Sequence, residues 1–158
     1  PWDGAPRFSP DGRSIVITLG TATQPSPHSS IGTALHVLDA NGGNARRMTP
    51  WSLGAGNPDW SPDGTRIVFT SEGGHTPFIY TVGADGSGLT RLTRSRADDE
   101  HPSWSPDGRR LAYSSGFSQR RQGHLRWLMV MPANGGRAVR VGHFAGVLDP
   151  SWSPAGVR

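Results

Sequence analysis

The sequence predicts an all-β fold built from β-propeller blades, and three observations lead to this prediction. An aromatic residue followed by Ser-Pro, one further residue and Gly recurs four times, at steps of 52, 44 and 48 residues. The first three copies are each followed by a run rich in β-branched and aromatic residues, and then by an apolar run that ends close to Asn-Gly or Asp-Gly. Four strands in a unit of roughly 40 to 50 residues are typical of a propeller blade. We therefore expect three full blades of four antiparallel strands and the start of a fourth.

The recurring pattern encodes a tight turn between the first two strands of each blade. Ser, Pro and Gly occupy the first, second and fourth positions at which a type I β-turn prefers them. Proline also holds the residue before it in the extended region, so a strand should run directly into the turn. Trp60, Trp104 and Trp152 share one strand position, which predicts that they pack between neighbouring blades. The turn aspartates should be structural, and they are Asp11, Asp63 and Asp107.

A second hairpin follows in each unit. Asn41-Gly42, Asp85-Gly86 and Asn134-Gly135 come directly after the apolar runs. Asn-Gly and Asp-Gly are typical of type I′ turns, in which both central residues have positive φ. The fourth strands are expected in the residues that follow, at 45–49, 89–93 and 138–142.

One partial propeller domain is expected to cover residues 1–158. The full blades should span about residues 6–57, 58–101 and 102–149, and the fourth blade should begin at 150–158. Propellers close with typically 4 to 8 blades. We therefore expect either that a longer chain continues this one or that a homo-oligomer closes the ring.

Composition and motifs argue against several classes of function. All sixteen basic residues are Arg and the net charge is +4, but they form no concentrated basic stripe, so nucleic-acid binding is not predicted. No apolar stretch is long enough to span a membrane. The sequence lacks the nucleophile elbow, the phosphate-binding loop, the His-Glu-x-x-His motif and any Cys. We predict no catalytic residue, no cofactor and no metal ligand.

The variable loops should gather at the end of the blades opposite the tight turns, where binding residues are often displayed over a rigid scaffold. Many of the polar side chains there could equally be merely solvated, and the acidic run 98–100 is interpreted as a solvated loop. His101 and its register equivalents Asn57 and Asp149 should approach the channel mouth from successive blades, although a metal or sugar-acid site would need closer convergence of ligands. The candidate partner-binding residues are His75, Arg94, Arg96, Asp98, Asp99, His101, Phe117, Arg120, Arg121, His124, His143 and Phe144.

The repeat as a whole resembles a known family. Pro-x-Trp-Ser-Pro-Asp-Gly-x-x-Ile-x-Phe, an apolar strand, Asp/Asn-Gly and a closing Arg-Leu-Thr are similar to the TolB-type propeller repeat, a WD-like blade. The resemblance covers nearly the whole chain, and residues 58–93 are its cleanest copy. Departures are Phe8 in place of Trp, Ala155 in place of Asp, and an insertion at residues 21–31.

The resemblance implies a non-catalytic scaffold that binds a protein or peptide partner through its variable-loop face, in the periplasm or outside the cell. Two alternatives stay open. The chain could be the substrate-gating propeller of a prolyl-oligopeptidase-type serine peptidase whose catalytic domain is absent from these residues. It could also be a carbohydrate-binding or lyase propeller.

Overall fold

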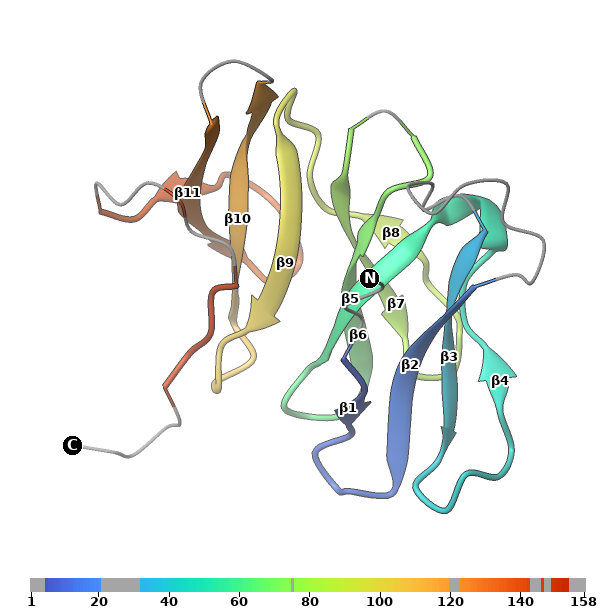
Figure 1. Ribbon diagram of the computed structural model, residues 1–158. Coiled ribbons are helices and arrows are strands. Elements are labelled where there is room, and N and C mark those ends of the chain that lie inside the picture. The colour runs from blue at the N-terminus through green and yellow to red at the C-terminus, as the bar shows by residue number, and fades with distance from the viewer. Residues whose placement is uncertain are drawn as a thin grey trace.

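The computed structural model consists of three four-stranded antiparallel sheets, in agreement with the predicted fold class (Figure 1). It describes residues 5–20, 32–74, 76–119, 123–142, 146 and 149–153. In each sheet the strands lie in chain order, so every sheet is one blade. None of the described residues forms a helix long and apolar enough to cross a membrane.

Within each blade the four strands lie side by side in the order in which they occur in the chain. Blade 1 contains β1 (Arg7–Phe8), β2 (Ser14–Gly20), β3 (Thr33–Asp39) and β4 (Arg46–Arg47). A short 3-10 helix, η1 (Trp51–Leu53), leads to blade 2, which contains β5 (Ala55–Trp60), β6 (Arg66–Ser71), β7 (Phe78–Gly83) and β8 (Thr90–Arg91). Blade 3 contains β9 (Asp98–Trp104), β10 (Arg110–Gln119), β11 (Gly123–Pro132) and β12 (Val139–Arg140).

The turn between the first two strands has the predicted form in all three blades. In blade 2 the Gly64 N–H donates to the Ser61 carbonyl at 2.8 Å, and Gly64 has a φ of +69° that suits glycine. The Ser61 hydroxyl donates to Asp63 Oδ1 at 2.6 Å and accepts from the Arg66 N–H at 2.9 Å. The same two hydroxyl contacts recur at Ser9 and Ser105. The carboxylates of Asp11, Asp63 and Asp107 thus accept hydrogen bonds within their own turns.

The second hairpin differs from the predicted type I′ turn. In blade 1 the Gly42 N–H donates to the Asp39 carbonyl at 2.8 Å, so Ala40 and Asn41 are the central residues, and neither has positive φ. Gly42, just after the turn, has a φ of +88°, and Asn44 further along the loop has a φ of +54°. This is the longer hairpin loop in which a glycine follows an ordinary turn. The Asn41 side chain instead accepts the Gly43 N–H at 3.0 Å, so it closes the loop without adopting positive φ itself.

Neighbouring blades pack through two apolar clusters. In junction 1–2, Val16, Leu35 and Met48 of blade 1 meet Trp60, Ile67, Phe69 and Val82 of blade 2. In junction 2–3, Val68 and Ile79 of blade 2 meet Trp104, Leu111, Tyr113 and Met131 of blade 3. Because Ile67 and Val68 face opposite junctions, β6 is apolar on both faces. The predicted position of Trp60 and Trp104 between blades is confirmed.

The outermost strands are only two residues long, and each carries an Arg at the same register. The guanidinium carbon of Arg47 lies 5.6 Å from the centre of the Trp51 ring. The corresponding distances are 3.4 Å from Arg91 to Phe78 and 5.0 Å from Arg140 to Trp127. The outer edge of each blade is thus covered by a cation held over an aromatic ring.

Candidate functional site

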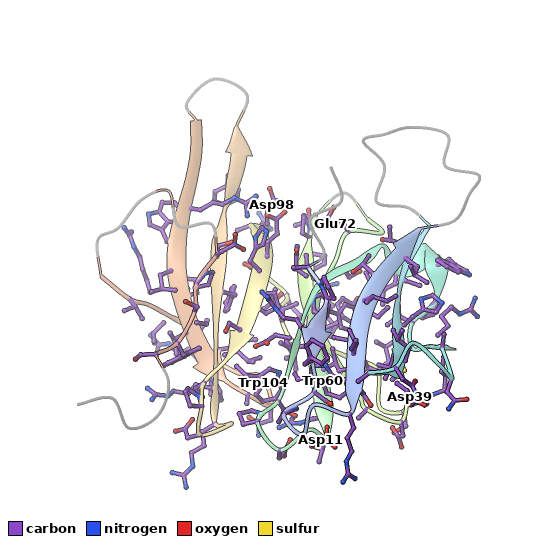
Figure 2. The ribbon with its side chains drawn as sticks, turned by 60° about the horizontal axis from the view of Figure 1, so that its bottom comes forward. Asp11, Asp39, Trp60, Glu72, Asp98 and Trp104 are labelled. Carbon is purple, nitrogen blue, oxygen red and sulfur yellow. The ribbon has the colours of Figure 1, made fainter. Side chains whose placement is uncertain are left out.

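The two ends of the blades differ as predicted. The tight turns lie together at the lower end in Figure 1, and the described segments between β6 and β7 and between successive blades lie at the upper end. Figure 2 shows Asp11 near the lower end, and Asp98 and Glu72 at the upper end. We call the upper end the variable-loop end.

The structure places the candidate residues of this end in three ways. Arg94 and Arg96 are exposed in the segment between blades 2 and 3, as expected. Asp98, Asp99, His101, Phe117 and His124 were expected in loops but lie on strands β9, β10 and β11. The pairing of β10 with β11 continues from Arg110 opposite Pro132 to Gln119 opposite Gly123, which carries both strands far into the predicted loop. His75, Arg120, Arg121, His143 and Phe144 lie outside the described residues.

The acidic run is buried in part, so its interpretation as a solvated loop is wrong. Asp99 is fully buried, and its carboxylate accepts hydroxyl hydrogen bonds from Ser115 at 2.6 Å and from Ser95 at 2.7 Å. Its N–H donates to the Pro77 carbonyl of the preceding blade at 3.1 Å. Burial raises the pKa of Tyr113, and the negative charge of Asp99 raises it further. Asp99 therefore fastens the start of β9 and is not available to a partner.

Glu100, the next residue, forms an ion pair that sequence reasoning missed. Arg126 Nη1 contacts Glu100 Oε2, and the two side chains are 10% and 15% exposed. Burial raises the pKa of Glu100, and the charge of Arg126 opposes that rise. An unpaired charge at this depth would be costly. The signal available in the sequence was a single Arg in the apolar run of the third strand, because buried Arg residues are almost always paired.

His101 has a backbone conformation that is unusual for a residue with a side chain. Its φ is +53°, and Asn57, at the equivalent position of blade 2, has a φ of +51°. Both residues precede proline, and both lie where the pairing of the inner strand with its neighbour shifts register. Such β-bulges redirect a side chain at some cost in backbone energy. The His101 N–H donates to Thr70 Oγ1 of blade 2 at 3.1 Å, which holds the bulge against its neighbour.

The predicted approach of three register-equivalent residues is observed. Asn57, His101 and Asp149 all line one pocket of about 610 Å³ between the inner strands. His101 Nε2 lies 3.7 Å from Asp149 Oδ1, and His101 Nδ1 lies 4.0 Å from Glu100 Oε2. No group of three or more His or acidic side chains among the described residues is arranged to hold a metal ion. The side chains of Asn57, His101 and Asp149 can each form hydrogen bonds within this pocket.

The wall of this pocket contains buried polar groups, and not all of them have a hydrogen-bond partner among the described residues. Asp59 Oδ2 accepts the Trp104 N–H at 2.8 Å, and burial raises the pKa of Asp59. The Trp104 Nε1–H is buried without a hydrogen-bond partner among the described residues. The equivalent groups of Trp60 and Trp152 donate to the carbonyls of Arg7 and Ser103, at 3.1 and 3.2 Å.

Comparison with known proteins decides the family. The family model described as the TolB beta propeller domain matches residues 2–157. This chain belongs to the TolB β-propeller family. A putative TolB from Agrobacterium tumefaciens is 26% identical, with a TM-score of 0.72 over 84% of this chain and 46% of its own. TolB from Acinetobacter baumannii is 25% identical, with a TM-score of 0.69 over 95% of this chain and 34% of its own.

A curated relative has a different description. The uncharacterized peptidase YuxL of Bacillus subtilis is 35% identical over 65 residues, which are 41% of this chain and 9% of that protein. This TolB β-propeller chain thus spans less than half the length of each of these three proteins. Because the first strands of propeller blades surround a central channel, the pocket that contains His101 lies along the channel side of the blades and extends to Pro62 and Pro106 of the tight turns.

Proposed function

We propose that this TolB-like propeller is a non-catalytic scaffold that binds a protein or peptide partner at its variable-loop end and channel mouth. The observation that carries the proposal is the pair of strained bulges at Asn57 and His101. Two successive inner strands place a residue with a side chain at positive φ, and both side chains enter the same pocket. Backbone strain of this kind costs of order 1 to 3 kcal/mol per residue and is concentrated at binding and catalytic sites.

The surface around the pocket offers contacts that suit a protein partner. Arg94 and Arg96 are exposed in the segment that leads from blade 2 to β9, and Phe117 is 47% exposed on β10. Aromatic and Arg side chains are enriched among the residues that contribute most to protein interfaces. A periplasmic or extracellular location belongs to this proposal, because the resemblance to TolB implies it.

Site-specific photocrosslinking tests the proposal. A photoreactive amino acid is introduced at Phe117 or Arg96, and at Arg109 in the tight-turn end as the matched control. Crosslinking in the cells that produce the protein should join one defined protein to the first two positions and not to Arg109. Crosslinks of equal yield at all three positions, or none at Phe117 and Arg96, would contradict a partner at the variable-loop end.

Substitution of His101 distinguishes a loss of partner binding from a loss of stability. His101→Gly suits the positive φ and should leave the free energy of unfolding unchanged or raise it by up to about 1 kcal/mol. The same variant should lose the crosslinked partner, because it removes the ring that faces Asp149. Retention of the partner by a folded His101→Gly protein would exclude the channel mouth as its site.

The similarity to the YuxL peptidase supports a second candidate, a propeller that gates a separate hydrolase domain. A fluorophosphonate probe, which labels activated serines, distinguishes the two when it is applied to the whole natural polypeptide that contains these residues. The scaffold proposal expects no labelling. Labelling that depends on a serine outside residues 1–158 would favour the peptidase.

A further inference from the structure

A second groove lies at the tight-turn end, where the sequence indicated only structural turns. It has a volume of about 670 Å³ and runs between the turns of blade 1 and those of blade 2. Val37, Trp60 and Ala84 supply apolar surface, and Pro10 and Pro62 extend it along the two first turns.

The groove is acidic although the whole chain carries a net charge of +4. Asp11, Asp39 and Asp63 line it, and Arg46 is the one cation among the described lining residues. The Arg46 guanidinium already donates to the Ala84 carbonyl at 2.8 Å and contacts the Asp85 carbonyl. The lining thus holds three carboxylates and one guanidinium, and the charges of Arg13 and Arg66 act on Asp11 and Asp63 from outside it.

The turn aspartates keep one oxygen for a ligand. Within the described part of the chain, the side-chain hydrogen bonds of Asp11 and Asp63 all use Oδ1, which accepts from the turn serine and from the residue two positions later. The same bonds lower the pKa of both carboxyl groups, so both are ionised at neutral pH. Oδ2 of each can accept from a cationic group in the groove.

Part of the lining is specific to this junction. Asp39, Asn44 and Arg46 of blade 1 stand where blade 2, at the same register, has Gly83, Gly88 and Thr90. Blade 2 forms the same hairpin without these side chains. Asn44 has a φ of +54° where Gly88 has +65°, and its amide donates to Asp39 Oδ2 at 2.7 Å, so Asn44 and Asp39 also hold the hairpin of blade 1. All three line the groove.

We propose that this groove docks an extended segment of a partner protein in which basic side chains flank an apolar one. The apolar side chain would cover Val37 and Ala84, and the basic ones would lie against Asp11, Asp39 and Asp63. Charge complementarity of this kind directs association and orientation. The inference goes beyond the proposed function and does not depend on it, because the carboxylates of this groove do not line the pocket that contains His101, although the two share Trp60 and Pro62.

Peptide binding provides the test. The probe is fluorescein-labelled Gly-Ser-Gly-Arg-Leu-Arg-Gly-Ser-Gly, and its comparison peptide has Glu in place of both Arg residues. Fluorescence anisotropy at low salt should show at least about tenfold tighter binding of the Arg peptide, with the advantage shrinking as salt is added. Asp11→Asn with Asp63→Asn should weaken binding about tenfold, if each exposed pair contributes a few-fold. Asp39→Asn, which lies outside the Ser-Pro-Asp-Gly turns, should weaken it a few-fold.

Asp107→Asn is the matched control, because Asp107 makes the same turn contacts in blade 3 but does not line the groove. This variant should bind the Arg peptide as tightly as the wild type. Amide NMR signals of Gly64 and Ala84 should shift with peptide, whereas that of Gly108 should not. Equal binding of both peptides, an equal loss in Asp107→Asn, or binding that EDTA abolishes would overturn the proposal. So would a peptide that binds only to a dimer formed through this face.

Discussion

The two junctions between blades use the same aromatic position but treat its polar group differently. In junction 1–2 the Trp60 Nε1–H donates to the Arg7 carbonyl at 3.1 Å. In junction 2–3 the indole Nε1–H of Trp104 is buried and has no hydrogen-bond partner among the described residues. The Asp59 carboxylate there accepts a hydrogen bond from the backbone N–H of Trp104. A buried, unsatisfied donor costs about 1 to 3 kcal/mol. The indole N–H therefore contributes a hydrogen bond to junction 1–2 but none, among the described residues, to junction 2–3.

The largest expected effect comes from the core of junction 1–2. Phe69→Ala removes a fully buried ring from that cluster and should lower the free energy of unfolding by about 3 to 5 kcal/mol. Urea unfolding followed by fluorescence measures it, with Leu89→Ala as the control, because Leu89 is 41% exposed. A loss below about 1 kcal/mol would show that the two blades are not packed together in solution.

The indole groups themselves provide the sharpest test of the comparison. Trp60→Phe removes the hydrogen bond to Arg7, whereas Trp104→Phe removes a donor that has no acceptor. Trp60→Phe should therefore cost about 1 kcal/mol more than Trp104→Phe. Equal losses in urea unfolding would mean that the two junctions are equivalent in this respect.

The pH dependence should have opposite signs in a turn and in junction 2–3. Hydrogen bonds from Ser61 and Thr65 lower the pKa of Asp63 to about 2 from an ordinary value of 3.8. Ionised Asp63 thus stabilises the fold above pH 3.8, and this contribution is lost as the pH falls towards about 2. Burial raises the pKa of Asp59, so its ionisation reduces stability as the pH rises above 3.8.

Urea unfolding of Asp63→Asn and Asp59→Asn between pH 2 and 7 measures both effects. The penalty of Asp63→Asn relative to the wild type should shrink towards pH 2. The free energy of unfolding of Asp59→Asn should increase relative to that of the wild type as the pH rises above about 4. Curves that run parallel to the wild type for both variants would contradict the assigned pKa directions.

The smallest effect is expected from the cation over Trp104. The Arg66 guanidinium carbon lies 4.7 Å from the centre of that ring, and blade 1 has Ser14 at the equivalent position. Arg66→Met keeps most of the side-chain volume and should cost about 0.5 to 1 kcal/mol. A double-mutant cycle with Trp104→Phe measures the coupling energy between Arg66 and the Trp104 ring. A coupling energy of zero would mean that this cation does not distinguish junction 2–3 from junction 1–2.

The sequence predicted the features that neighbouring residues determine. Ser61, Pro62 and Gly64 encode their turn without help from the rest of the chain, so its position and hydrogen bonds could be anticipated. The second hairpin was only half predicted. Asn-Gly indicated a reversal, but whether the glycine lies inside the turn or just after it depends on how the flanking strands pair.

The candidate site was less predictable because it depends on pairing and burial between distant segments. The positive φ of His101 arises from a bulge opposite β10, and no local residue pattern announces it. Asp99 reads as a surface carboxylate until Ser115, sixteen residues away, is placed beside it. Arg126 and Glu100 meet for the same reason. Which candidate residues contact a partner stays a prediction.

The short outer strands have a consequence for how this protein behaves at high concentration. An exposed strand edge can recruit a strand from another molecule, and long flat edges are the usual starting point for fibrils. Here each outer strand ends after two residues and carries Arg47, Arg91 or Arg140 over a ring. Two molecules that approached edge to edge would bring like charges together and find few backbone groups to pair. The rim of the propeller thus resists polymerisation.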